Sequence, residues 1–160
     1  MKKWTPWLLT ALLVLSLTAC AGGREEKAGI QLEITKADGT VETMTTQELM
    51  DLCETNEVNY NTNYRGCAVT VTGPVHTVEQ ERSQIFQSIW TDVAHLTLGE
   101  VRDGPQVEFD IVMGDDSYAD FDFTALGEGT MVTAQGELGE AFVTVEIDDA
   151  HDLALVTQEA

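Results

Sequence analysis

Hydrophobic and polar residues alternate along most of the chain after residue 29, which predicts a domain built mainly from β-strands. Residues 30–34 alternate, Asp38-Gly39 supplies a turn, and residues 41–44 can return, so a small β-hairpin is expected over residues 29–44. Further strands are expected at residues 67–78, 96–98, 107–113, 130–135 and 141–147, with residues 153–156 extending the sheet.

One segment has the sequence of a helix start. Thr45-x-x-Glu48 is a capping box, and Met44 and Leu49 are placed as a hydrophobic staple, so a helix is expected from here to about Asn56. Residues 59–64 are poor helix material, and residues 82–90 fit a helix or a strand. A short helix is expected at residues 118–126, and a turn is expected around Gly139.

The order of these elements predicts the fold class. Five strands follow the first helix, with a short helix between the third and the fourth. This is the order of an OB-fold, a five-stranded Greek-key barrel, and we expect a helix plus OB-fold domain over residues 45–157. Another small barrel or sandwich is the alternative.

The first 20 residues have the organisation of a bacterial lipoprotein signal. Lys2 and Lys3 form a basic start, residues 7–17 are apolar but short for a membrane-spanning helix, and residues 17–20 read Leu-Thr-Ala-Cys. This tetrapeptide resembles the lipobox, where cleavage leaves a lipidated cysteine first. We therefore expect a signal peptide at residues 1–19, diacylglycerol and a further acyl chain such as palmitate at Cys20, and a flexible tether over residues 20–28. An ordinary signal peptide or an uncleaved anchor is the alternative.

The charge balance excludes several partner classes. The chain has 28 acidic and 8 basic residues, a formal net charge of −20. Removing residues 1–19 takes away two lysines and no acid, which leaves 6 basic residues and a net charge of −22. Proteins that bind nucleic acid carry basic patches, so nucleic acid is not expected as a partner. Anionic lipid headgroups would equally repel the domain, so contact with the membrane is expected through the lipid at Cys20.

Short motifs across residues 46–156 resemble a bacterial OB-fold family, the tRNA-anticodon-binding-like family. Members commonly show an Asn-Glu near a helix end, a Tyr-Lys-Gly turn and a Val-x-Val-x-Gly-x-Val strand. Here the matching segments are Asn56-Glu57, Tyr64-Arg65-Gly66, residues 69–75, residues 126–136 and residues 145–155. The sequence departs from the pattern at Arg65, where a lysine is usual, and at residues 79–92, which are longer than expected.

The resemblance implies the OB fold, and we do not extend it to nucleic-acid binding. A fold does not determine a function, and OB-folds that bind single strands need a basic groove with stacking aromatic residues. The expected third strand and its neighbours are instead acidic. Exported members with a lipobox are, as the resemblance implies, mostly of unknown role.

Two cysteines remain beside Cys20. Cys53 is expected on the helix face and Cys67 at the start of the first barrel strand. In an oxidising envelope they are a candidate disulfide, which would contribute about 3 kcal/mol by closing a loop of about 15 residues. The alternative is two buried thiols that pack as small hydrophobic residues.

An acidic loop and three aromatic residues are the other candidate sites. A loop rich in carboxylates can hold Ca²⁺, although the spacing here does not match an EF-hand; the candidate metal ligands are Asp115, Asp116, Asp120 and Asp122. The alternative is a solvated loop that caps the next helix. The acidic segment 148–152 is expected to be a turn. Phe86, Trp90 and Tyr118 lie near expected loops and form a candidate binding surface, unless they cover a barrel end.

These features together predict a non-catalytic protein. We expect an exported, lipid-anchored protein whose acidic OB-fold domain binds or scaffolds an envelope partner outside the cytoplasm, with no cofactor. The alternative is a lipoprotein that binds Ca²⁺ or a small ligand through residues 115–122. The motifs GxSxG, HExxH, GxGxxG and CxxC are absent from the sequence.

Overall fold

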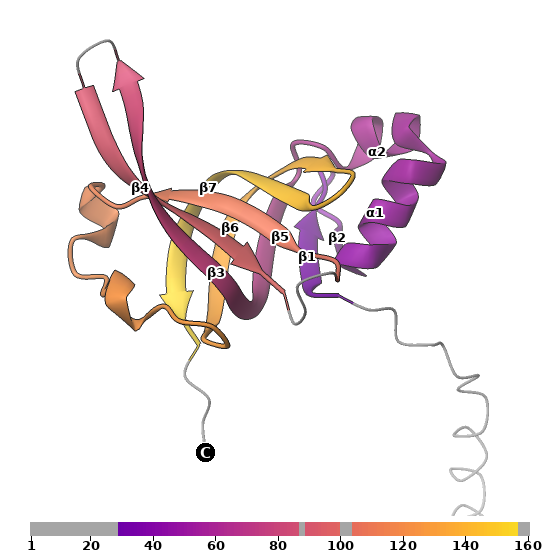
Figure 1. The fold of residues 1–160 in the computed structure, drawn as a ribbon. Coiled ribbons are helices and arrows are strands. Elements are labelled where there is room, and N and C mark those ends of the chain that lie inside the picture. The colour runs from indigo at the N-terminus through magenta and orange to yellow at the C-terminus, as the bar shows by residue number, and fades with distance from the viewer. Residues whose placement is uncertain (1–28, 87–88, 100–103, 157–160) are drawn as a thin grey trace, which may run out of the picture.

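The computed structural model describes residues 29–86, 89–99 and 104–156, with the backbone alone at 83–86, 89 and 90. The strands described form one sheet, five of which close into a barrel (Figure 1). The barrel strands are β3 (Ala68–Phe86), β4 (Ile89–Leu98), β5 (Val107–Val112), β6 (Met131–Ala141) and β7 (Val145–Leu155). No helix within the described ranges is long and apolar enough to cross a membrane. Cys20 and the expected signal peptide and tether lie outside these ranges.

The strand order confirms the predicted OB-fold. Strand β4 pairs antiparallel with β3 and β5, β5 pairs parallel with β7, and β7 returns antiparallel to β6. The barrel closes where β6 pairs antiparallel with the first half of β3, from Ala68↔Glu137 to Pro74↔Met131. Inward-facing residues of all five strands fill the interior, because side chains alternate between the two faces of a strand.

The predicted N-terminal hairpin is also present. Strands β1 (Gln31–Thr35) and β2 (Val41–Thr45) pair antiparallel, and β1 then pairs with β3 in the register Leu32↔Val71. The alternation of the sequence puts Leu32 and Ile34 on the inner face, where both are fully buried. The hairpin thus extends the barrel sheet along the half of β3 that β4 does not cover.

Helix α1 (Thr46–Thr55) begins where the capping box predicts. The Thr45 hydroxyl accepts a hydrogen bond from the Glu48 backbone N–H at 3.2 Å, and the Glu48 carboxylate accepts one from the Thr45 N–H at 3.1 Å. Leu49 and Cys53 are buried on one face of the helix. The sequence predicts no helix directly after α1, but residues 57–63 form a second helix.

Helix α2 (Glu57–Asn63) corrects the expectation that this segment is poor helix material. The Asn56 side chain caps it by accepting a hydrogen bond from the Asn59 N–H at 3.0 Å. Tyr60 is 1% exposed, and its hydroxyl donates to the Gly139 carbonyl oxygen at 2.8 Å. Burial of this one side chain against the barrel outweighs a helix propensity deficit of a few tenths of a kcal/mol per residue.

Three other sequence expectations change in detail. Residues 82–86 and 89–90 are strand, because β3 and β4 pair with each other far beyond the barrel. The segment at 118–126 forms two 3-10 helices, Asp116–Tyr118 and Phe123–Ala125, instead of one short α-helix. The turn expected at Gly139 lies at residues 142–144, since β6 continues to Ala141.

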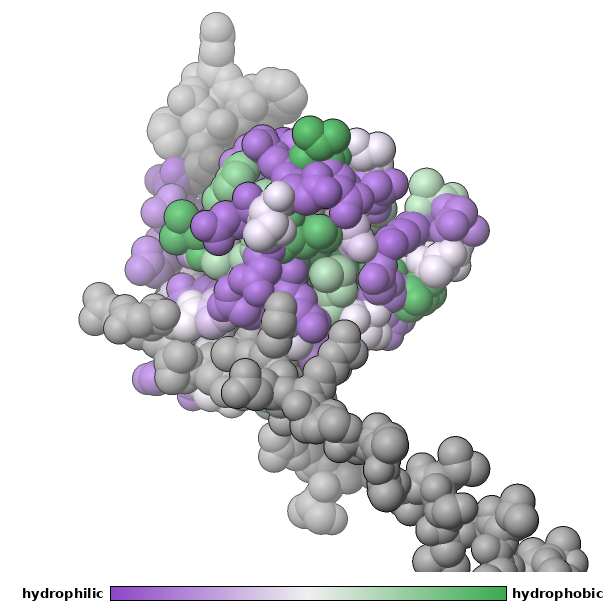
Figure 2. All heavy atoms as spheres, turned by 90° about the vertical axis from the view of Figure 1, so that its right-hand side faces the viewer, coloured by the Kyte–Doolittle hydropathy of each residue, from purple (hydrophilic) through white to green (hydrophobic). Residues whose placement is uncertain are grey.

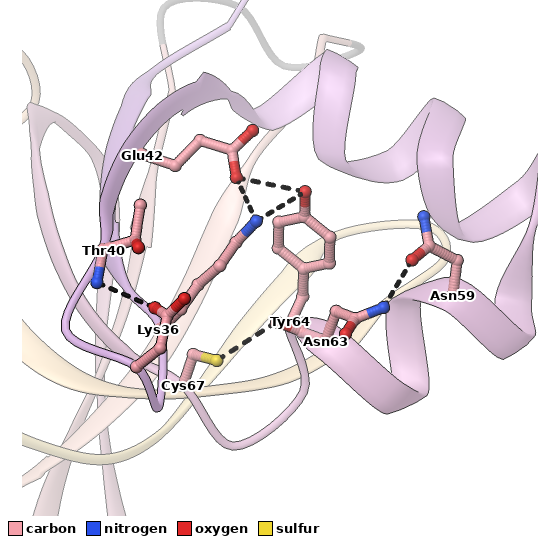
Figure 3. Close-up of polar contacts among 8 residues, drawn as sticks. Lys36, Thr40, Glu42, Asn59, Asn63, Tyr64 and Cys67 are labelled. Atoms are coloured by element: carbon pink, nitrogen blue, oxygen red, sulfur yellow. Dashed lines mark hydrogen bonds and ion pairs between the residues drawn. The ribbon is translucent and has the colours of Figure 1, made fainter.

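A polar cluster joins the N-terminal hairpin to the end of α2 (Figure 3). The Lys36 ammonium lies 2.5 Å from the Glu42 carboxylate and donates to the Tyr64 hydroxyl at 3.3 Å. The Tyr64 hydroxyl donates to Glu42 at 3.1 Å, and the Lys36 nitrogen lies 4.5 Å from the centre of the Tyr64 ring. The hydrogen bond from Lys36 is the main reason that the pKa of Glu42 is lowered, and the same bond raises the pKa of Lys36.

We expect the substitution Lys36→Met to raise the pKa of Glu42 toward its ordinary value. A carboxylate with a lowered pKa stabilises the fold above its unfolded pKa, near 4.3, and loses this contribution as the pH falls through the folded pKa. The stability difference between the natural chain and the variant should therefore be constant well above the unfolded pKa and shrink as the pH falls through the lowered pKa of the folded state. Carboxyl NMR titration and urea unfolding measure these two effects.

Arg65→Met is the matched control for this substitution. Arg65 contacts Glu140 at 3.5 Å with both side chains about half exposed, and it does not touch Glu42. The control should leave the pKa of Glu42 unchanged. An unchanged Glu42 pKa in Lys36→Met would show that the ion pair is not what lowers it.

Candidate functional site

A hollow of about 650 Å³ opens on the outer face of the barrel, over β4, β5 and β7 and beside the first 3-10 helix. Carboxylates dominate its lining: Glu108, Asp110, Asp115, Glu146, Asp148, Asp149 and Asp152. His95, Ser117, Tyr118 and His151 add further polar groups. No lysine or arginine is among the described residues that line it. The hollow is therefore a concave, acidic surface.

The parallel pairing of β5 with β7 concentrates these charges. The register places Glu108 beside Glu146, while the neighbouring Phe109 and Ile147 point into the core. Like charges on paired strands repel each other, so this arrangement lowers stability and favours a positively charged partner. The Thr144 hydroxyl donates to the Glu108 carboxylate at 3.3 Å, which orients it.

A strained segment of β7 forms one wall of the hollow and corrects the turn expected at residues 148–152. Asp149 and Asp152 have positive φ angles of 48° and 53°, and the register with β6 shifts here. The segment stays within β7 as a bulge, where the chain crosses closely over Gly136 of β6. Positive φ costs a non-glycine residue about 1 kcal/mol, and aspartate and asparagine adopt it more readily than most other residues do.

Two histidines, His95 and His151, border the hollow, and in each of them the Nδ1 nitrogen contacts an oxygen atom. His95 Nδ1 lies 2.6 Å from the Asp110 carboxylate, and His151 Nδ1 lies 2.7 Å from the Asp149 carbonyl oxygen. A carbonyl oxygen accepts only, so Nδ1 of His151 carries the proton. These contacts hold each ring in place beside the carboxylates.

Tyr118 belongs to the hollow but is not an exposed aromatic residue. It is 8% exposed, and its hydroxyl accepts a hydrogen bond from the Leu153 N–H at 3.4 Å. Its ring packs edge-on against Phe121 and Phe123, at 6.2 and 6.1 Å between ring centres. Burial raises the pKa of Tyr118. Tyr118 thus closes one end of the barrel and presents only a small edge to the hollow.

The acidic loop uses two of its four candidate metal ligands as helix caps. The Asp115 carboxylate accepts from the Ser117 N–H at 2.8 Å, and Asp122 accepts from the Thr124 N–H at 3.0 Å. Hydrogen bonds from the side chains of Ser117 and Thr124 are the largest cause of the lowered pKa values of these two carboxyls. Capping of the following helix is the alternative role that the sequence predicts for this loop.

The four candidate metal ligands do not converge. Asp116 and Asp120 are exposed, and only Asp115 of the four lines the acidic hollow. Among the residues that the structure describes, no group of three or more His, Cys, Asp or Glu side chains is arranged to hold a metal ion.

The candidate disulfide between Cys53 and Cys67 is not present in the structure. Both residues are free thiols. Cys53 is buried under α1, and burial is the main cause of its raised pKa. Cys67 lies at the end of α2 with Sγ 3.4 Å from the Asn63 carbonyl oxygen (Figure 3). Cys53 is thus packed as a small buried hydrophobic residue, whereas Cys67 is only partly buried.

Phe86 and Trp90, the other two candidate binding residues, lie on β3 and β4 and are not among the described residues that line the hollow. The register pairs Gln84 with Trp90 and Phe86 with Ile89. Their side chains lie outside the described part of the structure. The binding surface expected from Phe86, Trp90 and Tyr118 therefore stays a prediction.

A comparison with protein families identifies the chain. The family model described as tRNA_anti-like matches residues 1–142. The chain belongs to the tRNA_anti-like family. Searches of curated proteins and of solved structures found no match. The tRNA_anti-like match and the barrel topology agree on the OB fold.

Only part of the acidic hollow of this tRNA_anti-like domain can be predicted from the sequence. The charge of residues 108 and 110 was evident from the alternation of their strand, and that of residues 148–152 from composition. Their convergence was not evident, because parallel pairing of β5 and β7 joins segments about 40 residues apart. The alternation Val-Glu-Ile at 145–147 is the one local signal that places Glu146 on the same face.

Proposed function

We propose that this protein is an exported bacterial lipoprotein, anchored through Cys20, whose OB-fold domain binds or scaffolds a protein of the cell envelope without catalysing a reaction. The observation that carries the binding part is the acidic hollow over β4, β5 and β7. Its volume of about 650 Å³ lies in the ordinary range of binding sites. The lipobox-like residues 17–20 support the anchoring part.

Charge selects the partner. A hollow lined by carboxylates, on a domain with a net charge near −20, repels nucleic-acid phosphates and anionic headgroups. The same field speeds the association of a positively charged surface. A partner protein that presents lysine or arginine side chains fits the hollow, and the word tRNA in the family description does not extend to this chain.

The test is a crosslinked pull-down of the full lipoprotein from solubilised envelopes. The variant Asp110→Lys with Glu146→Lys reverses two charges of the hollow. We expect it to reduce recovery of the partner about tenfold, because a like charge replaces an attractive one at the contact. Glu33→Lys with Glu54→Lys makes the same change of net charge at exposed positions on β1 and α1, and it should leave recovery unchanged.

Two further arms of the pull-down separate the alternatives. The Cys20→Ala chain should capture the same partner from outside the membrane, because the hollow and not the lipid makes the contact. Calcium or a chelator should not alter recovery. An equal loss in both double variants would mean that net charge alone drives recovery, and a partner lost with chelator would favour a cation-dependent site.

A further inference from the structure

The turn that joins β6 to β7 exposes two neighbouring apolar side chains. Ala141 pairs with Val145 across the turn, and both residues are fully buried. Between them, Phe142 is 54% exposed and Val143 is 84% exposed. Tight turns are usually built from glycine, proline, asparagine, aspartate or serine, and residues 141–145 contain none of these. Covering the two exposed side chains with apolar material from outside the domain would be favourable.

The turn is also free of charge, although the domain is strongly acidic. Residues 141–145 contain no charged residue. Glu140 comes directly before them and lies 3.5 Å from Arg65. Glu146 comes directly after them and lies beside Glu108, at the near end of the acidic hollow. The turn is therefore a neutral apolar point bordered by carboxylates, which suits uncharged apolar surroundings better than an anionic surface.

Contacts of α1 place this turn at the end of the domain where residues 20–28 join it. The Ala141 backbone forms a hydrogen bond with the Cys53 sulfur, near the end of α1. At the start of α1, the Thr46 N–H donates to the Ile30 carbonyl oxygen at 2.9 Å. The segment of α1 from Thr46 to Cys53 is only about 10 Å long. Figure 1 shows the turn and the start of β1 on the same side of the barrel as α1 and α2.

The length of the tether brings this end of the domain close to a bilayer. The nine residues from Ala21 to Gly29 span at most about 30 Å. This reach exceeds the offset of the turn from Gly29, so the turn can touch the bilayer while a lipid at Cys20 stays inserted. Figure 2 faces this end of the domain and shows hydrophobic residues among hydrophilic ones. Two apolar side chains bind weakly by themselves, but a tether makes their contact intramolecular and raises the effective concentration.

We propose that the β6–β7 turn inserts Phe142 and Val143 into the interface of the bilayer that holds the lipid anchor. This inference rests on the anchoring part of the proposed function. The length and attachment point of the tether select the bilayer as the occupant, since they keep it within reach of the turn. A second copy would bring Glu140 against its own counterpart. Because the Thr144 hydroxyl donates to Glu108, the contact would also fix the position of the acidic hollow relative to the membrane.

The experiment measures tryptophan fluorescence of the full lipoprotein in phosphatidylcholine vesicles. Removal of residues 1–19 leaves Trp90 as the only tryptophan of the sequence, so Trp90→Phe gives a silent background. In that background Phe142→Trp probes the turn. Leu155→Trp is the matched control, because Leu155 is 45% exposed at the other end of β7, about 30 Å away along the strand. Brominated phosphatidylcholine should quench the Phe142→Trp chain and leave the Leu155→Trp chain unquenched.

Two further changes test the physical cause of the contact. In the Phe142→Trp chain, Val143→Ser should lower the ratio of inserted to free turn about tenfold, because it removes apolar surface that the bilayer would cover. Leu155→Ser in the same chain should leave quenching unchanged. Anionic phosphatidylglycerol in the vesicles should weaken quenching, since Glu140 and Glu146 border the turn.

Each contrary result has a distinct meaning. No quenching at position 142, in a chain that its lipid holds on the vesicles, would overturn the role of the turn and leave the proposed function standing. Equal quenching at positions 142 and 155 would overturn it too, as would quenching that survives Val143→Ser or rises with anionic lipid. A blue shift at position 142 without quenching would replace the bilayer by a second copy. Absence of lipid on Cys20 by mass spectrometry would overturn this inference together with the proposed anchoring.

Discussion

Replacing Tyr60 with alanine is expected to lower the free energy of unfolding by about 4 kcal/mol. Tyr60 is 1% exposed and connects α2 to the barrel through its hydrogen bond to the Gly139 carbonyl oxygen. Its ring lies parallel to that of Tyr64 at 6.3 Å between centres. Truncation would leave a large void and an unpaired carbonyl group at once. Urea unfolding followed by circular dichroism measures the loss.

Two companion variants separate the causes. Tyr60→Phe keeps the ring and removes the hydrogen bond, so it should cost about 1–2 kcal/mol. Val58→Ala changes an exposed residue of the same helix and should stay within about 0.5 kcal/mol of the natural chain. If Tyr60→Phe were as damaging as Tyr60→Ala, the hydrogen bond and not the packing of the ring would hold α2 in place.

Replacing Gly136 with alanine is expected to cost about 3 kcal/mol and to disturb the acidic hollow. A Cβ atom at this position would clash with Cγ2 of Ile147 and would lie 2.7 Å from the Asp148 carbonyl oxygen. The second contact is with backbone, which cannot swing aside. To relieve it, β7 would have to lift off β6 at the bulge that carries Asp149 and Asp152, two residues of the hollow's lining.

Gly127→Ala is the matched control for this substitution. A Cβ atom there meets nothing closer than the Thr130 hydroxyl at 4.0 Å. Urea unfolding should show a small change for Gly127→Ala and a large one for Gly136→Ala. Partner recovery in the pull-down should fall for Gly136→Ala alone at a temperature where both variants are folded. Equal stability of the two variants would show that β7 can retreat from β6 without cost.

These two positions show how far the sequence could predict this fold. Gly136 directly follows the strand expected at residues 130–135. The reason for a glycine there is the close approach of β7, which no local pattern reveals. Tyr60 lies in a segment of weak helix formers, and the local prediction of no helix was wrong. In both cases a contact across more than 10 residues of sequence decided the structure, and such contacts leave no periodic signal.

The acidity of the candidate site could be predicted from the sequence, but the grouping of its residues could not. Composition alone indicated an acidic domain, and the structure gathers that charge into the hollow. The grouping of Asp115 with Asp116, Asp120 and Asp122 as metal ligands relied on closeness in sequence. The chain instead uses Asp115 and Asp122 to cap 3-10 helices, since a carboxylate next to unpaired backbone N–H groups is satisfied locally.

The sequence by itself determined the N-terminal hairpin, the start of α1 and the order of the barrel strands. These depend on side-chain alternation, turn residues and the Thr45–Glu48 capping box, which act between residues a few positions apart. The tertiary structure alone decided α2, the separate packing of Cys53 and Cys67, the burial of Tyr118 and the acidic hollow. The acidic hollow requires the parallel pairing of β5 with β7, and α2 requires the contact of Tyr60 with Gly139 of β6, because both contacts join segments that are far apart in the sequence.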